Sequence, residues 1–140
     1  MNLQTEIEFD IRFSETDAMG VVWHGNYLKF FEDGREAFGK EHGLAYLDMY
    51  SNGYFTPIVK SEINHKSPID YGHSAKIITT LIPSRAAKIN FEYEIINLST
   101  GLVSAVGKTM QVFLLAKTRE LDLNIPDFYL EWEDKKGIKK

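Results

Sequence analysis

The sequence predicts an α+β fold in which a five-stranded antiparallel sheet is covered by one long helix. Hydrophobic and polar residues alternate in several segments, and this period of two is typical of strands with one buried face. A spacing of three and four, which indicates an amphipathic helix, occurs over residues 27–42. Because the helical pattern is not interleaved with the strand patterns, we expect an antiparallel rather than a parallel sheet.

Residues 3–13 are expected to form the first strand, because their alternation runs without a break. Its buried side consists of Leu3, Thr5, Ile7, Phe9, Ile11 and Phe13. Residues 14–26 break the pattern with Ser, Thr, Asp and Gly, which are typical of turns. The helix should begin directly afterwards, because Gly25 and Asn26 are both suitable N-cap residues.

The helix over residues 27–42 should place one face against the sheet. That face consists of Tyr27, Phe30, Phe31, Gly34, Ala37, Phe38 and Glu41. Glycine within a helix costs roughly 1 kcal/mol relative to alanine, so Gly34 predicts a close approach of the helix backbone to the sheet. Gly43 stands where a C′ residue would end the helix. We interpret the opposite face as solvated, including the carboxylates of Glu32, Asp33 and Glu36.

Four more strands are expected after the helix. They cover residues 55–65, 75–82, 87–96 and 102–115, with a hairpin loop at 97–101. A short aromatic segment from Asp127 to Glu133 follows Pro126. Residues 1–134 should form a single domain, followed by a basic tail, residues 135–140, that we expect to be frayed.

Composition excludes several classes of function. The chain of 140 residues has no cysteine, which excludes a disulfide scaffold, a zinc ribbon and a cysteine nucleophile. Its four histidines are scattered, so no metal site is expected. A net charge of −4 argues against nucleic-acid binding. The sequence shows neither a signal peptide nor a membrane span, and we expect a cytoplasmic protein.

The segment that joins the first strand to the helix contains the residues most suited to catalysis. A helix start presents unpaired N–H groups and a partial positive charge, which can stabilise a developing oxyanion. Asp17 lies seven residues before His24 and can face the same place. The structural alternatives are that Asp17 only caps its turn, and that His24 is a capping or packing residue.

The same segment resembles the signature of a known enzyme family. The matching residues are Arg12, Phe13, Thr16, Asp17, Gly20, Val21, Val22, His24, Asn26 and Tyr27. This run is similar to the 4-hydroxybenzoyl-CoA thioesterase family, which includes the Tol-Pal-associated (YbgC-like) acyl-CoA thioesterases. Residues 65–72 look like that family's strand-to-turn segment. The resemblance covers nearly the whole chain and implies the hotdog fold.

The resemblance implies roles for individual residues. Asp17 would be the catalytic carboxylate, either as the nucleophile on the thioester carbonyl or as the base that activates water. Backbone N–H groups at His24 and Gly25 would hold the thioester oxygen. The strand residues Val59, Lys60 and Ser61 would lie beside the acyl group.

Two basic residues and four aromatic residues complete the expected site. Arg85 and Lys88 are similar to the turn that contacts CoA phosphates, although a solvated charge pair explains them equally well. The acyl pocket is expected to be lined by Tyr46, Tyr50, Tyr54 and Phe55. No metal and no separate cofactor are implied, since CoA is part of the substrate.

Thioester hydrolysis by an acyl-CoA thioesterase is therefore the leading hypothesis. The alternatives are a hotdog dehydratase or hydratase that uses Asp17 and His24 as an acid–base dyad, and a non-catalytic acyl-CoA-binding protein. One helix cannot cover five strands and also close a pocket. The resemblance accordingly implies a homo-oligomer, either a dimer with a continuous sheet or a dimer of dimers, with the site between subunits. The acyl group, and the choice between CoA and acyl carrier protein, stay open.

Overall fold

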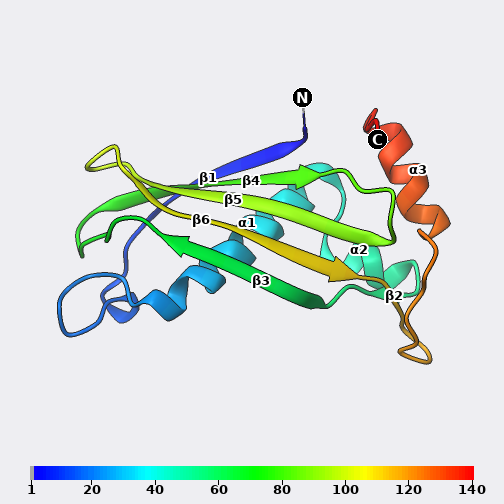
Figure 1. The fold of residues 1–140 in the computed structure, drawn as a ribbon, viewed down its shortest axis with the longest axis horizontal. Coiled ribbons are helices and arrows are strands. Elements are labelled where there is room, and N and C mark those ends of the chain that lie inside the picture. Colours follow the sequence, from blue (N-terminus) through cyan, green and yellow to red (C-terminus); the bar gives the residue numbers. More distant parts are fainter. Residues whose placement is uncertain (1) are drawn as a thin grey trace.

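The computed structural model describes residues 2–140 and contains one five-stranded antiparallel sheet with a long helix across one face (Figure 1). The strand order is β1-β4-β5-β6-β3. The strands are β1 (Gln4–Asp10), β3 (Ile58–His65), β4 (Ser74–Ile82), β5 (Lys88–Asn97) and β6 (Val103–Val112). The helix is α1 (Tyr27–His42). The α+β class is thereby confirmed.

Helix α1 has the expected bounds, and its buried stripe forms the centre of the core. Phe30, Phe31 and Phe38 are fully buried, and the ring of Phe31 stacks on that of Tyr93 at a centroid distance of 4.2 Å. A Cβ on Gly34 would collide with Thr79 Oγ1 and lie 3.1 Å from Ile77 Cδ1. The expected close approach of α1 to the sheet is therefore confirmed.

Both ends of α1 are also defined by local chemistry. Gly43 adopts a left-handed conformation at φ 75°, as expected for the residue that ends the helix. Asn26 occupies the N-cap position, but within residues 2–140 its side chain accepts no capping hydrogen bond from the helix. Its side-chain amide instead donates to the carbonyl of Glu15. This bond ties the start of α1 to the segment that follows β1.

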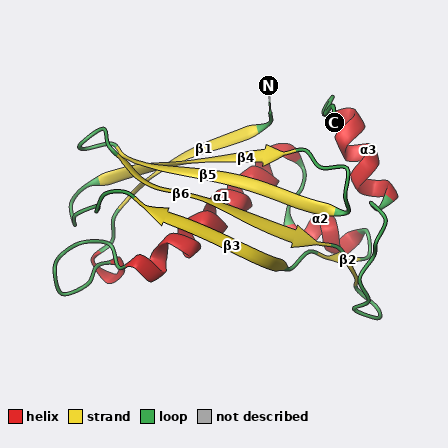
Figure 2. Cartoon of the chain, in the orientation of Figure 1, coloured by secondary structure: helices red, strands yellow, loops and turns green. Residues whose placement is uncertain are grey.

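The structure adds short elements that the sequence patterns did not predict. They are the helices α2 (Tyr46–Ser51) and α3 (Asp127–Lys135), and a separate two-stranded ribbon of β2 (Tyr54–Phe55) with β7 (Leu114–Leu115) (Figure 2). Two 3₁₀ turns, η1 (Phe13–Glu15) and η2 (His24–Asn26), flank the connection to α1. Helices of six and nine residues span too few turns for a clear period.

The strand expected over residues 55–65 begins at Ile58, because Phe55 belongs to β2 of the separate ribbon. Two further expectations about the strands need correction. The first strand ends at Asp10, because η1 turns the chain away, and Phe13 is 76% exposed instead of buried. The expected strand over residues 102–115 is divided at Phe113 into β6 and β7, which belong to different sheets. In both cases a pattern of apolar residues continues past the point where the chain leaves the five-stranded sheet.

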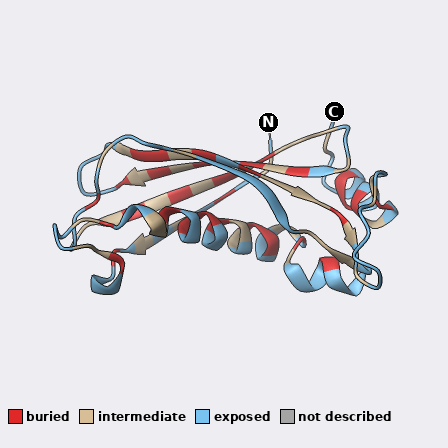
Figure 3. Cartoon of the chain, turned by 60° about the horizontal axis from the view of Figure 1, so that its bottom comes forward, coloured by how far each residue is buried: buried red, intermediate tan, exposed pale blue. Residues whose placement is uncertain are grey.

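Helix α1 packs against β1 and β4 and leaves the opposite edge of the sheet uncovered (Figure 3). That edge is β3, in which every residue except Ile63 is exposed. Within residues 2–140, β3 pairs only with β6, so its outer backbone groups have no strand partner. An open edge of this length is a template for pairing with another strand.

The end of the chain folds back onto the domain. Trp132 in α3 donates from its indole nitrogen to the carbonyl of His42. Ile138 packs against the core, and the ammonium of Lys140 lies 2.7 Å from Glu133 Oε1. The tail thus has contacts of its own, while the domain boundary expected at residue 134 stays a prediction. No helix within residues 2–140 is long and apolar enough to span a membrane.

Candidate active site at the start of helix α1

Asp17 lies at the tip of a small hairpin between β1 and α1. Thr16 and Val22 form an isolated bridge, the N–H of Asp17 donates to the carbonyl of Val21, and the N–H of Gly20 donates to the carbonyl of Asp17. Gly20 closes the turn at φ 77°, a conformation that favours glycine. The turn signals of this segment therefore place Asp17 in a defined, not a flexible, position.

The carboxylate of Asp17 uses one of its two oxygens within the turn. Oδ1 accepts a hydrogen bond of 2.8 Å from the N–H of Met19, which is the geometry of an Asx turn. Within residues 2–140, Oδ2 accepts no hydrogen bond from any other group. The structural role and the chemical role proposed for Asp17 are thus compatible, because they involve different atoms.

The start of α1 provides two donors in the same connecting segment as Asp17. Turn η2 begins at His24, and among residues 2–140 the N–H groups of His24 and Gly25 have no acceptor. The carbonyl of Glu15 accepts from the N–H of Trp23 at 2.9 Å, so the residues just before Asp17 lie against those just before His24. A carboxylate and two unpaired N–H groups therefore share one loop.

Gly25 has a steric reason to be glycine. A Cβ at this position would collide with the indole ring of Trp23, which lies across the backbone of Gly25. The Trp23 and His24 rings are also in contact, with centroids 5.1 Å apart. Within residues 2–140 no hydrogen bond joins the His24 imidazole to the Asp17 carboxylate.

Glu15 is a site residue that sequence reasoning missed. Its side chain is buried, with Oε1 accepting from the N–H of Arg12 at 2.7 Å and Oε2 lying 3.2 Å from the ammonium of Lys29. Together with its carbonyl, which accepts from Trp23 and Asn26, Glu15 anchors both ends of the loop that carries Asp17. The hydrogen bond from Arg12 and the ion pair with Lys29 on α1 together explain why an acidic side chain is buried here.

The end of β3 adjoins the start of α1 on the helix side of the sheet. The Tyr27 ring contacts the His65 imidazole edge-to-face at 4.8 Å, and the Tyr27 hydroxyl is hydrogen-bonded to Ser104 Oγ at 3.0 Å. Burial raises the pKa of Tyr27 above its usual value, so this hydroxyl is protonated at neutral pH. His65 is exposed at the edge of the candidate site.

The strand residues expected beside the acyl group lie further along β3. Val59 and Lys60 lie near the opposite end of β3 from His65 and Ser61 near its middle, in a strand whose eight residues span roughly 23 Å. Ser61 pairs with Thr109 and shares the helix side of the sheet. Within one chain these residues therefore do not form one site with Asp17.

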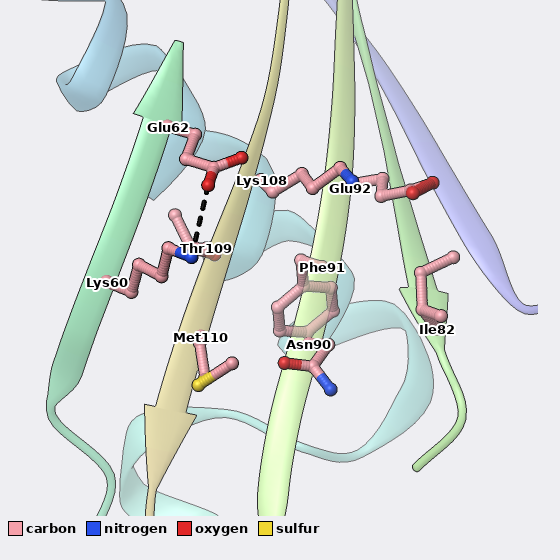
Figure 4. Close-up of a pocket in the computed structure, with 9 residues that line it drawn as sticks. All are labelled: Lys60, Glu62, Ile82, Asn90, Phe91, Glu92, Lys108, Thr109 and Met110. Atoms are coloured by element: carbon pink, nitrogen blue, oxygen red, sulfur yellow. Dashed lines mark ion pairs between the residues drawn. The ribbon is translucent and has the colours of Figure 1, made fainter.

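Lys60 also points away from the helix side. It lines a shallow cavity of about 320 Å³ on the helix-free face and lies 3.2 Å from Glu62 (Figure 4). The cavity is bordered by the alternate charged residues Glu62, Lys108 and Glu92, which pair across neighbouring strands. Its position separates Lys60 from the loop that carries Asp17.

Arg85 and Lys88 are likewise distant from Asp17 within one chain. They follow β4, whereas the Asp17 loop is bonded to the segment before β4 through Val21, Asp70 and Tyr71. The nine residues of β4 separate the two ends by roughly 26 Å. Both basic residues are exposed, and Arg85 donates to the carbonyl of Lys140 at 3.3 Å.

A larger cavity lies between α1, α2 and the open side of the sheet. Its volume is about 570 Å³, and Tyr46, Met49, Thr56, Phe91 and Gln111 are among the residues that line it. Of the four aromatic residues expected in an acyl pocket, Tyr46 lines this cavity. Tyr54 instead packs on Phe113 and Phe128 and donates its hydroxyl to Asp122 at 2.7 Å.

Comparison with known proteins identifies the family. Residues 11–132 match the model of the thioesterase-like superfamily. The chain belongs to this superfamily. The match includes the Asp17 loop, α1 and all strands after β1, and the hotdog fold expected from the resemblance is confirmed. The narrower kinship with the 4-hydroxybenzoyl-CoA and YbgC-like enzymes stays a prediction.

Individual relatives within the superfamily are similar over different lengths. YneP of Bacillus subtilis (strain 168), provisionally named an acyl-CoA thioesterase, is 39% identical over 90 residues, which are 64% of this chain and 65% of YneP. The match thus spans just under two thirds of that relative. A 1,4-dihydroxy-2-naphthoyl-CoA hydrolase of Nostoc punctiforme is 27% identical over 125 residues, covering 87% of this chain and 81% of the relative.

A solved structure extends the similarity to almost the whole chain. The crystal structure of a DHNA-CoA thioesterase from Staphylococcus aureus has a TM-score of 0.78 and is 27% identical. It covers 98% of this chain, and this chain covers 97% of it. The arrangement of the sheet and the long helix is therefore shared along the entire length.

Proposed function

We propose that this protein hydrolyses acyl-CoA thioesters to a free acid and CoA. The observation that carries the proposal is the free Oδ2 of Asp17 in the same loop as the two unpaired N–H groups of His24 and Gly25. Acyl transfer from a thioester requires a nucleophile or base and an oxyanion site. Membership of the thioesterase-like superfamily supports this chemistry, and the names of the relatives support an acyl-CoA substrate.

The N–H groups of His24 and Gly25 would stabilise the thioester oxygen as it becomes an oxyanion. They belong to the start of α1, where the helix dipole adds positive potential. The site then needs no cationic side chain for this step. The Trp23 ring over Gly25 would limit the access of water to these donors, which strengthens the hydrogen bonds that they form.

Asp17 can act in two ways with the same geometry. As a nucleophile, Oδ2 forms a bond to the carbonyl carbon, the carbon–sulfur bond breaks, and CoA leaves as a thiolate; water then cleaves the mixed anhydride and restores the carboxylate. As a base, Oδ2 takes a proton from water, the hydroxide attacks, and the expelled thiolate takes up that proton. Both routes use the oxygen that the turn leaves free.

We also propose that the working unit is at least a dimer, joined through β3. Antiparallel pairing of β3 with a second copy would place the start of one strand beside the end of the other. Val59 and Ser61 of the partner subunit would then lie beside His65, at the start of α1. This arrangement brings together residues that one chain keeps roughly 13–20 Å apart. The cytoplasmic location expected from the sequence stays a prediction.

The test is the Asp17→Asn variant. Asn can accept the Met19 N–H as Asp does, so the melting temperature should change little. We expect kcat to fall by at least about a hundredfold, the lower end for loss of a positioned proton-transfer group. Affinity for a CoA thioester, measured by direct binding, should stay close to that of the wild type.

Asp70→Asn provides a matched control, since Asp70 is an exposed acid in the neighbouring turn. A stable Asp17→Asn protein with native kcat would remove Asp17 from the mechanism. Free thiol in the assay reports hydrolysis, while a hydratase would release none. Binding of the thioester without any turnover would identify a non-catalytic acyl-CoA-binding protein.

A further inference from the structure

The residue that precedes the long helix cannot cap it. Turn η2 runs into α1 without a break, so the combined helix spans residues 24–42 and Asn26 lies inside it. The N-cap residue of this combined helix is Trp23, which has φ −64° and ψ 133° and whose carbonyl accepts from the N–H of Asn26 at 2.9 Å. This backbone geometry is that of an N-cap residue. A capping side chain must accept a hydrogen bond, and an indole can only donate one.

A cap at position 23 would engage a group that the proposed hydrolysis uses. The side chain of an N-cap residue accepts from the N–H of the second or third helical residue. Those residues are Gly25 and Asn26, and the N–H of Asn26 is already bonded to the carbonyl of Trp23. In the part of the chain that the structure describes, the N–H of Gly25 has no acceptor. A capping side chain would therefore bind the Gly25 N–H, which is one of the two proposed oxyanion donors.

The start of the long helix also lacks an acidic residue in its first turn. Helix α2 has Asp48 there, and α3 has Asp127. An acidic side chain in the first turn offsets the partial positive charge of a helix start. Among residues 2–140, neither η2 nor the first turn of α1 contains one. The positive potential at this helix start is therefore available to a developing oxyanion.

The backbone carbonyl of Glu15 holds the helix start in place of a cap. It accepts from the N–H of Trp23 at 2.9 Å and from the side-chain amide of Asn26 at 2.8 Å. These two donors precede and follow His24 and Gly25 in the chain. The N–H groups of His24 and Gly25 are thus fixed in position by their neighbours, although within the described residues they are not bonded themselves.

Packing alone does not explain a tryptophan at position 23. Trp23 is 50% exposed, although its ring lies across the backbone of Gly25 and contacts the His24 ring at a centroid distance of 5.1 Å. Serine, threonine, asparagine or aspartate at an N-cap position would stabilise the helix more. Residues that break a local preference in this way are expected mainly at functional sites, where stability is given up for activity.

We propose that Trp23 is a positioning residue that leaves the long helix uncapped, so that the N–H of Gly25 stays available to the thioester oxygen. The inference rests on the proposed function, because the oxyanion of thioester hydrolysis is what this donor would serve. A cap and the oxyanion compete for one N–H group. The free energy that a cap adds to folding is therefore lost from the transition state, and a cap should change stability and turnover in opposite directions.

The experiment compares Trp23→Thr with Trp23→Val in the intact protein. Both variants lose the indole, the two new side chains are similar in size, and only threonine can cap. The melting temperature of Trp23→Thr should exceed that of Trp23→Val by roughly 2–5 °C. Its kcat/KM should be about fivefold lower, which is the rate equivalent of one typical cap. The substrate is whichever of acetyl-, octanoyl- and benzoyl-CoA the wild type cleaves fastest.

Pro126→Thr and Pro126→Val form a matched control at another helix start. Pro126 is the N-cap residue of α3 and, within residues 2–140, makes no side-chain capping bond. Pro126→Thr should again be the more stable of the two, because threonine can cap α3. The two variants should have equal kcat/KM, since α3 contributes no donor to the proposed site.

Amide hydrogen exchange provides a measurement that does not require the Trp23 variants to fold. The N–H of Gly25 should exchange rapidly in the substrate-free wild type, because no acceptor protects it, and slowly in Trp23→Thr. Protection of this N–H in the substrate-free wild type would overturn the inference. Equal kcat/KM in Trp23→Thr and Trp23→Val would also overturn it, as would stability and kcat/KM that change in the same direction. Each of these results would leave the proposed hydrolysis intact. Failure of the wild type to cleave any of the thioesters would instead refute the proposed function, and this inference with it.

Discussion

At the scale of single residues, the site depends on which atom of a side chain is already engaged. Within residues 2–140 Asp17 uses Oδ1 to accept from Met19 and leaves Oδ2 without a donor, so a residue that forms a turn keeps an oxygen for the proposed hydrolysis. Gln111 shows the same division, with its nitrogen bonded to Thr56 and its oxygen unpaired. The proposed hydrolysis therefore depends on a free atom of Asp17 rather than on the residue type alone.

Arg85 and Lys88 lead to a prediction about the CoA phosphates. If they bind the nucleotide of CoA, the double variant Arg85→Ala with Lys88→Ala should raise KM about tenfold and leave kcat nearly unchanged, because these contacts are equal in ground and transition states. Steady-state kinetics with one CoA thioester measures both parameters. Lys117→Ala, in an exposed loop, controls for the loss of surface charge. An unaltered KM would identify the pair as solvated charges.

At the scale of elements, α1 is held against the sheet at one glycine. The backbone of Gly34 approaches Thr79 and Ile77, and Phe31 reaches Gly107, where a Cβ would lie 2.5 Å from its ring. Small residues on both elements thus let large aromatic side chains fill the space between them. This packing determines where the start of α1 lies relative to Asp17.

Gly34→Leu should therefore destabilise the protein by about 1–3 kcal/mol or more, because the larger side chain has no space against Thr79. Denaturant unfolding measures the change in the free energy of unfolding. Asp33→Leu, which adds the same side chain at an exposed position of α1, should have a much smaller effect. Equal stability of Gly34→Leu and the wild type would contradict the packing described here.

At the scale of the whole molecule, buried tyrosines make stability dependent on high pH. Burial, and secondarily the hydrogen bond to Asp122, raises the pKa of Tyr54 to about 12. Burial also raises the pKa of Tyr93 and Tyr129 above 10. A raised pKa in the folded state means that folding favours the protonated hydroxyl. This contribution is complete below pH 10 and is lost as the pH rises towards 12.

The free energy of unfolding should consequently fall between pH 10 and pH 12. Urea titrations at several values of pH would measure the slope. Tyr54→Phe should make the slope shallower, because one linked proton is removed, even if it lowers stability at pH 8 through loss of the bond to Asp122. A slope that is identical in wild type and variant would exclude Tyr54 as a contributor.

The open edge of β3 leads to a prediction about assembly. Sedimentation at micromolar concentration should show at least a dimer rather than a monomer of 16.1 kDa. Val59→Asp, at an exposed apolar position of β3, should shift the protein to monomers and abolish turnover, because the site would be incomplete. Leu123→Asp, in a distant exposed loop, should do neither. A fully active monomer would refute the shared site.

The sequence by itself determined the features that depend on local periodicity and turn chemistry. The alternation of apolar residues indicates the strands, and the aromatic stripe from Tyr27 to Phe38 defines the long helix that Gly43 ends. The turn residues around Asp17 place it before the helix start, and the resemblance of that run identifies the superfamily. Each of these signals lies within a few residues or one helix, where sequence spacing translates directly into geometry.

Only the tertiary structure decided which of these residues meet. The burial of Glu15 depends on Lys29, and the exposure of Phe13 depends on the turn after β1. The orientation of the Gln111 amide depends on Thr56, which is 55 positions away in the chain. The alternation in β3 indicates a strand. It does not indicate that this strand forms an open edge of the sheet, or that Lys60 faces away from Asp17. Such facts follow from strand order and from pairing between distant segments, and the period of a single strand contains no information about its neighbours.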